Sequence, residues 1–152
     1  MRKALLLLLL VVSGSAYSQI EFLDTTQSEV VGKVSYVYLE KIGDNDYNFF
    51  FKNINAIGHE YVNFSFKNVD NDIDKLYNGI MQGFENVPRD PLKMKANGQI
   101  VWLKYTREDG EVFLQIQLTS GDEENPLQAM EDSIKVSRLL TADDIKRLFK
   151  KE

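Results

Sequence analysis

The acidic clusters are the side chains in this sequence most suited to chemistry. The stretch Asp70-Asn71-Asp72-Ile73-Asp74 has the alternating oxygen ligands of a calcium-binding loop. Such a loop needs glycine at its sixth position and glutamate at its twelfth, where this chain has Lys75 and Met81. The stretch therefore predicts the capped start of a helix rather than a calcium site, and we expect no metal or other cofactor.

Zinc and triad chemistry lack their partners in this sequence. His59 is the only histidine, and the chain has no cysteine. Structural zinc sites use four ligands, mostly cysteine and histidine, so one histidine is not enough. A serine nucleophile in a glycine-flanked elbow is also absent after residue 18. We therefore expect His59 to be an ordinary loop residue at the entrance to a strand.

A pair of carboxylates is the remaining catalytic option. Glycoside hydrolysis uses two acids about 5 to 10 Å apart across a cleft. The chain has 23 acidic residues, but no spacing distinguishes one pair from the others. Glutamates such as Glu40 and Glu60 flank expected strands, which is typical of solvated edge charges. A small carboxylate-dependent hydrolase is kept as an alternative function, and the residues favour a protein that is not an enzyme.

Aromatic side chains are the feature most suggestive of binding. The chain has one Trp, seven Tyr and nine Phe. In the expected strands, several aromatics lie on the face opposite a more regular apolar set: Tyr36, Tyr38, Phe49, Phe51, Trp102 and Phe113. An open sheet face of this kind is typical of a surface that binds protein, glycan or lipid. The competing interpretation is a second buried core covered by the last helix. The residues predicted to bind a ligand are Trp102, Tyr36, Tyr38 and Phe113.

Residues 1–18 have the layout of a secretory signal peptide. Arg2 and Lys3 give a positive start, residues 4–12 form an apolar run, and small residues precede Gln19. The run is much shorter than the roughly 20 residues that cross a bilayer as a helix. We therefore predict cleavage between Ser18 and Gln19, no membrane anchor after cleavage, and a bacterial protein that is periplasmic or secreted.

The remaining residues, 19–152, have the length of one domain, in which 19–28 are expected to be a mobile lead-in. The formal net charge of the whole chain is −5. An acidic surface argues against nucleic acid as the main partner. Because the chain has no cysteine, disulfides and an N-terminal lipid anchor are excluded, and stability must come from packing and hydrogen bonds.

Two short triplets suggest modification after export. Asp24-Thr25-Thr26 and Asp132-Ser133-Ile134 resemble the Asp-Ser/Thr-apolar triplets that some exporting bacteria O-glycosylate. The resemblance covers only three residues at each site. It implies Thr25 and Ser133 as modification sites, and Thr25 is the better candidate because it lies in the expected lead-in.

Alternating polar and apolar residues predict strands along much of the chain. Asn97-Gly98 is typical of a two-residue hairpin turn, and the strands around it are expected to form a three-stranded antiparallel meander. The expected strands cover residues 30–42, 47–54, 61–68, 92–95, 100–106 and 112–118, with a weaker one at 133–139.

Helical periodicity predicts one long helix over residues 71–86. Gly79 and Gly83 weaken it, and they are small enough to let the helix lie close to a sheet. Its start is expected to be capped by Asp70, Asn71 and Asp72. Its apolar stripe consists of Ile73, Leu76, Tyr77, Ile80, Met81 and Phe84.

A second, short helix is expected over residues 142–150. Thr141 is its predicted N-cap, Asp144 completes a capping box, and Leu140 and Ile145 occupy the positions of a hydrophobic staple.

These elements predict an α+β fold, with one antiparallel sheet of about six to seven strands and the helices 71–86 and 142–150 packed on it. The expected function is that of an exported, non-enzymatic binding or interaction module that uses an aromatic sheet face. The partner would be an unknown protein or a glycan. The alternatives are the small hydrolase and an inhibitor or accessory protein of a secreted enzyme.

Overall fold

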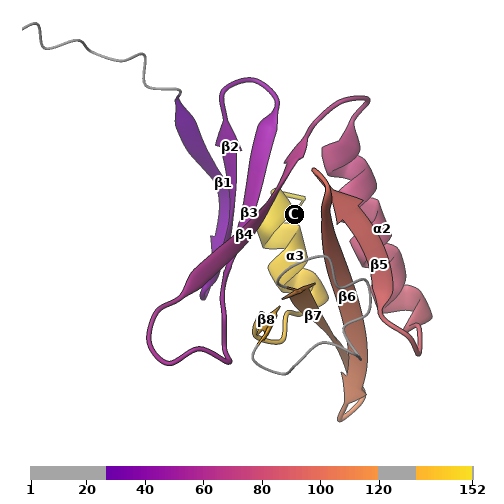
Figure 1. The fold of residues 1–152 in the computed structure, drawn as a ribbon. Helices are drawn as coiled ribbons and strands as arrows, with labels where there is room; N and C mark the ends of the chain where they lie inside the picture. The colour runs from indigo at the N-terminus through magenta and orange to yellow at the C-terminus, as the bar shows by residue number, and fades with distance from the viewer. Residues whose placement is uncertain (1–26, 120–132, 152) are drawn as a thin grey trace, which may run out of the picture.

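The computed structural model describes residues 27–119 and 133–151, which form an α+β fold with two antiparallel sheets. Each sheet has four strands, so the expected single sheet of six to seven strands is wrong. Sheet A has the order β1-β2-β3-β4, and sheet B has the order β5-β6-β7-β8 (Figure 1). The strands of sheet A are β1 (Ser28–Val34), β2 (Val37–Ile42), β3 (Asp46–Lys52) and β4 (Tyr61–Lys67). The strands of sheet B are β5 (Leu92–Ala96), β6 (Gln99–Glu108), β7 (Glu111–Thr119) and β8 (Ile134–Val136).

The segment 30–42, expected as one strand, belongs to two strands that form a hairpin. β1 and β2 pair up to Val34 and Val37, with Ser35 and Tyr36 in the turn. Tyr36 has a φ angle of 62°, which is uncommon for a residue other than glycine. The turn changes which parity faces the core, and this is why the segment is apolar on both faces in the sequence pattern.

The long helix α2 (Asp72–Asn86) follows sheet A and is capped differently from the sequence-based expectation. Asn71 is the N-cap residue, but its side chain makes no capping hydrogen bond to the backbone. Asn68 takes that role instead, because its Oδ1 accepts a hydrogen bond from the backbone N–H of Ile73 at 3.1 Å. Asp72 turns back to accept from the N–H of Val69 at 3.2 Å.

The short helix α3 (Ala142–Phe149) starts as its sequence predicts. The Thr141 hydroxyl accepts a hydrogen bond from the Asp144 N–H, and the Asp144 carboxylate accepts one from the Thr141 N–H, both at 3.1 Å. The two staple residues, Leu140 and Ile145, are both fully buried. The capping box therefore fixes the start of a helix whose apolar residues lie in the core.

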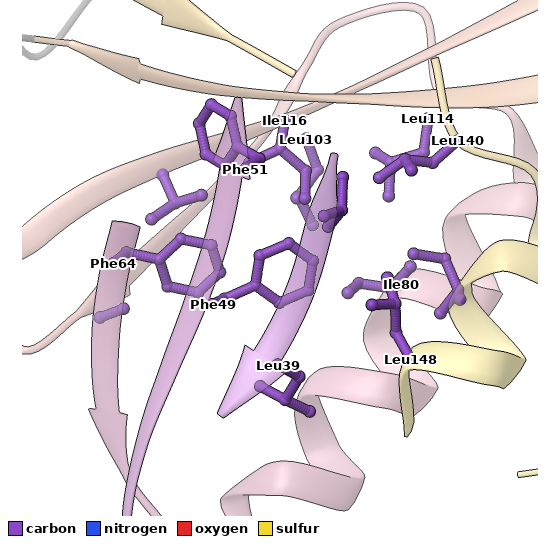
Figure 2. Close-up of a cluster of buried hydrophobic side chains, with 14 of the residues drawn as sticks. Leu39, Phe49, Phe51, Phe64, Ile80, Leu103, Leu114, Ile116, Leu140 and Leu148 are labelled. Carbon is purple, nitrogen blue, oxygen red and sulfur yellow. The ribbon is translucent and has the colours of Figure 1, made fainter. Parts of the chain in front are cut away.

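The core lies where the two sheets and the two helices meet. Figure 2 shows apolar side chains of both sheets and both helices packed together, and Figure 1 places α3 between the sheets. Ile145, Leu148 and Phe149 of α3 are buried. The Cβ of any larger residue at Gly32 would lie 2.3 Å from the carbonyl oxygen of Leu148, so β1 can approach the end of α3 this closely only with glycine.

A polar contact joins the end of β3 to β8 in the other sheet. Asn53 is buried, and its Oδ1 accepts a hydrogen bond from the N–H of Val136 at 3.1 Å. Its Nδ2 donates to Glu60 at 2.9 Å, and Glu60 also pairs with Lys135 of β8. The hydrogen bonds from Lys135 and Asn53 hold the pKa of Glu60 below its usual range.

We expect Asn53→Ala to lower the free energy of unfolding by about 1–3 kcal/mol, because the buried N–H of Val136 loses its acceptor. Asn63→Ala is the matched control, since Asn63 is exposed and makes one long hydrogen bond of 3.4 Å to Asn48. Urea denaturation measures both values. Equal changes in the two variants would contradict a structural role for Asn53.

The two glycines of α2 have different surroundings. A Cβ at Gly83 would lie 2.1 Å from the Tyr105 ring, whose hydroxyl donates a hydrogen bond to the Ile80 carbonyl at 2.8 Å. A Cβ at Gly79 would have no atom within 4 Å. The expected close approach of the helix to a sheet is therefore confirmed at Gly83 and absent at Gly79.

We expect Gly83→Ala to lower the free energy of unfolding by about 1–3 kcal/mol, because the added methyl overpacks the contact with Tyr105. Gly79→Ala should instead raise it by about 0.5–1 kcal/mol, since alanine has the better helix propensity and nothing opposes the methyl. Thermal or urea denaturation of the two variants would show opposite signs. The same sign in both would contradict this close contact.

Candidate functional site

A groove of about 650 Å³ lies between α2 and the facing edges of the two sheets. β4 is the edge strand of sheet A and β5 is the edge strand of sheet B, and they do not belong to one ladder. The volume is within the range of small-molecule pockets, roughly 300–1,000 Å³. The apolar residues that line the groove are Phe64, Phe66, Leu76, Ile80, Leu92, Met94, Ala96 and Leu103.

The groove extends from solvent to the core. Phe64, Ile80 and Leu103 line it and are also buried members of the core. Leu92 lines it from β5 and is 39% exposed. Gly79 forms part of the α2 wall without a side chain. A ligand in this groove would therefore contact side chains that the fold already holds in place.

Lysines dominate the charged residues around the groove. Lys67 comes from β4, Lys75 from α2, and Lys93 and Lys95 from β5, with Asp72 as the single acid among the lining residues. Asp72 accepts a hydrogen bond from Lys75 at 2.9 Å, and this contact lowers the pKa of Asp72 and raises that of Lys75. The lining is thus basic, although the whole chain has a net charge of −5.

A side-chain contact connects the two walls of the groove. Asn97, in the turn after β5, donates a hydrogen bond from Nδ2 to the Ser65 hydroxyl of β4 at 3.1 Å. Asn97 also lines the groove. Its φ angle of 48° is that of the expected Asn97-Gly98 hairpin turn, which places its side chain beside sheet A.

Two of the aromatic residues predicted to bind a ligand belong to sheet A and its first turn: Tyr38 of β2 lies on the face turned away from the core, and Tyr36 lies in the turn before β2. Tyr38 stacks on Phe50 with ring centroids 4.5 Å apart. The Tyr61 ring is tilted against the Tyr38 ring, with centroids 6.2 Å apart. Tyr36 is 52% exposed, and Lys52 lies over its ring at 5.0 Å. We call Tyr36, Tyr38, Phe50 and Tyr61 the aromatic face of sheet A.

The other two candidates lie on sheet B, so the structure does not bring the four together. Trp102 and Phe113 lie on the same face of that sheet. The cross-strand neighbour of Trp102 is Gln117, and that of Phe113 is Thr106. Lys93 lies over the Trp102 ring at 5.4 Å. The indole Nε1 of Trp102 is buried and has no hydrogen-bond partner in the described part of the chain.

Two aromatics that the sequence pattern placed with this set belong to the core instead. Phe49 and Phe51 are fully buried, and Phe49 stacks on Phe64 at 5.1 Å. The error follows from the strand boundaries, because relative parity between separate strands cannot be read from sequence before the pairing is known. The pairing register puts Phe49 opposite Leu39 and Phe64, and all three face the core.

The acidic cluster at the start of α2 has ionic partners. Asp72 pairs with Lys75, and Asp74 pairs with Lys151 at 2.7 Å and accepts from Asn71 at 2.7 Å. The pKa of Asp74 is lowered mainly by the hydrogen bond from Lys151 and to a smaller extent by the one from Asn71. Within residues 27–119 and 133–151, no group of three or more acids, histidines or cysteines is placed to hold a metal ion.

The remaining predicted residues fall partly outside the described structure. His59 is exposed in the loop between β3 and β4. Ser133 is half-buried just before β8. Ser18, Gln19 and Thr25 lie outside the described residues, so signal cleavage and modification at Thr25 stay predictions. Neither of the described helices has the length and apolar character needed to cross a membrane.

No protein-family model, curated protein or solved structure matches this chain. A function must therefore be inferred from the geometry of the groove and of the aromatic face of sheet A. Sequence reasoning missed the groove, whose only local signal is the alternation of apolar and basic residues along β5, Leu92-Lys93-Met94-Lys95-Ala96.

We expect Trp102→Phe to leave the free energy of unfolding unchanged within about 1 kcal/mol or to raise it, because it removes a buried donor that lacks an acceptor. Trp102→Ala should lower the free energy of unfolding, because the whole side chain and its packing contacts are lost. Urea denaturation of both variants makes the comparison. A loss in the phenylalanine variant as large as in the alanine variant would show that the indole N–H has a partner in the folded protein.

Proposed function

We propose that this chain is a non-enzymatic binding module that takes a small, largely apolar molecule into the groove between β4, β5 and α2. The observation that carries the proposal is the groove itself, with eight apolar side chains around about 650 Å³ that reach the buried core. Concave, mostly apolar sites on preformed elements are the usual form of small-molecule sites. The groove is thus the best place in the described structure for a ligand.

The aromatic face of sheet A supports a ligand site less well. Tyr38 and Phe50 stack at 4.5 Å with an interplanar angle of 13°, so each ring already uses one face on the other. Lys52 lies over one face of the Tyr36 ring at 5.0 Å. A glycan that stacks on aromatic residues needs an open ring face, and these contacts already occupy part of the Tyr36, Tyr38 and Phe50 rings.

A protein partner is the second candidate function, and it would use the aromatic face of sheet A. Tyr36 is 52% exposed and Tyr61 is 44% exposed, and exposed tyrosines are frequent anchors in protein interfaces. In Figure 1, no described helix or strand covers this side of sheet A. This surface fits the expected inhibitor or accessory role better than a small ligand.

Export to the periplasm or the medium remains part of the proposal, on the basis of residues 1–18. A binding module outside the cytoplasm could then capture its ligand without competition from cytoplasmic metabolites. Recovery of the mature protein with Gln19 as its first residue would support this part of the proposal, and recovery of the uncleaved chain would contradict it.

The test uses a neutral fluorescent probe, N-phenylnaphthylamine, whose emission rises in apolar sites. Gly79→Leu places an isobutyl group in the groove from a helix position where no atom lies within 4 Å of the new Cβ. We expect this variant to bind the probe at least roughly tenfold more weakly, a loss of about 1.4 kcal/mol. It should be no less stable than the parent, because leucine is the better helix former.

Tyr61→Ala is the matched control, since Tyr61 belongs to the aromatic face of sheet A and does not line the groove. It should leave probe binding unchanged. Loss of probe binding in Tyr61→Ala with binding retained in Gly79→Leu would move the site to sheet A. Failure of the parent protein to bind any apolar probe would refute the groove as a ligand site.

A further inference from the structure

We infer that the ligand of the groove is a single-chain amphiphile, an acyl chain with an anionic head group. This inference rests on the proposed function and adds the chemical class of the ligand. The apolar walls would hold the acyl chain, and the lysines around the groove would hold the head group. The shape is suitable because the groove lies along two sheet edges and one helix.

The charge distribution selects the sign of the head group. Four lysines and one aspartate line the groove, in a chain whose net charge is −5. Asp72 is already paired with Lys75, so its charge does not offset Lys67 and Lys95. The groove is therefore locally basic in a chain that is acidic as a whole, so an anion meets favourable charge there, and complementarity of this kind gives specificity.

The head group has a definite place beside the contact that joins the two walls. Ser65 and Asn97 make that contact, and Lys67 and Lys95 each lie two residues away from it in their own strand, about 7 Å along the backbone. Both lysines are exposed, and neither forms an ion pair with a described carboxylate. An anion between them would also be near the Asn97 amide.

The apolar chain would then extend inward from that position. Phe66 adjoins Lys67, Met94 adjoins Lys95, and each is half-buried in the groove lining. Below them lie the buried Phe64 and Leu103. Lysine ammonium groups act as point charges and can bind any small anion. The geometry therefore selects an anionic head group without selecting among carboxylate, sulfate and phosphate.

Lysines on edge strands have another common use, which is to discourage pairing with another chain. That use predicts aggregation when the lysines are replaced, and it predicts no preference between charged and neutral ligands. The two explanations are therefore distinguished by comparing two ligands that share a tail and differ in head-group charge.

The experiment measures displacement of N-phenylnaphthylamine from the purified protein by dodecanoate and by dodecanol, at concentrations below micelle formation. We expect dodecanoate to displace the probe at a roughly tenfold lower concentration than dodecanol, with the difference shrinking as salt rises. In Lys67→Glu/Lys95→Glu this preference should disappear, while displacement by dodecanol stays the same.

Lys33→Glu/Lys104→Glu is the matched control, because it changes the net charge equally at exposed lysines that do not line the groove. It should keep the preference for dodecanoate. Lys67→Gln/Lys95→Gln gives the same test if the glutamate variant does not fold, as judged by circular dichroism.

The results also separate the two levels of the proposal. Equal displacement by dodecanoate and dodecanol in the parent would overturn the anionic head group and leave the apolar groove as a binding site. A preference that persists in Lys67→Glu/Lys95→Glu would overturn the assigned head-group position. Absence of probe binding to the parent would refute the proposed function itself.

Discussion

Burial of the last helix between the two sheets is the interaction on which the rest of the structure depends. α3 contacts β1 and β2 of sheet A, β7 of sheet B, and α2. Its buried side chains Ile145, Leu148 and Phe149 face the core, and each contributes about 1.5–3 kcal/mol relative to an exposed side chain. The backbone bridge between Leu114 and Leu140 attaches the segment before the helix to β7. Without α3, the core faces of both sheets would be partly exposed.

The groove is a consequence of where the sheets are joined. α3 joins β1 and β2 to β7, and the Asn53–Val136 contact joins the end of β3 to β8, so neither contact pairs the edge strands β4 and β5 in a ladder. In the single sheet expected from the sequence, adjacent strands would pair through their backbones and leave no space for a ligand. Here the space is instead lined by side chains from both edges and from α2.

Local features of the fold could be read from the sequence because short-range physics determines them. The capping box of α3, the stripe of α2 and the Asn97-Gly98 turn each depend on neighbouring residues, and all three are present. The turn at Tyr36 could not be read, because a tyrosine in a left-handed conformation has no sequence signature and is held by its surroundings.

The division into two sheets and the groove could not be predicted for a related reason. A period of two tells which residues share a face of a strand, and it does not tell which strands pair. The sequence pattern puts Phe49 and Phe51 on the wrong face for this reason, because their burial is set by the pairing of β3 with β2 and β4. The alternation of lysine and apolar residues in β5 was visible, but its meaning depends on β5 being an edge strand that faces β4.

The two aromatic surfaces of the molecule also differ in what they can do. On the open face of sheet A, Tyr38 and Phe50 stack on each other, so their ring faces stabilise the sheet. At the floor of the groove, Phe64 stacks on Phe49 and is itself almost fully buried, so the fold holds this ring in position before a ligand arrives. A preorganised ring loses little conformational entropy on binding. Aromatic residues therefore stabilise sheet A on its open face and line the proposed ligand site in the groove, and the gap between β4 and β5 creates that second surface.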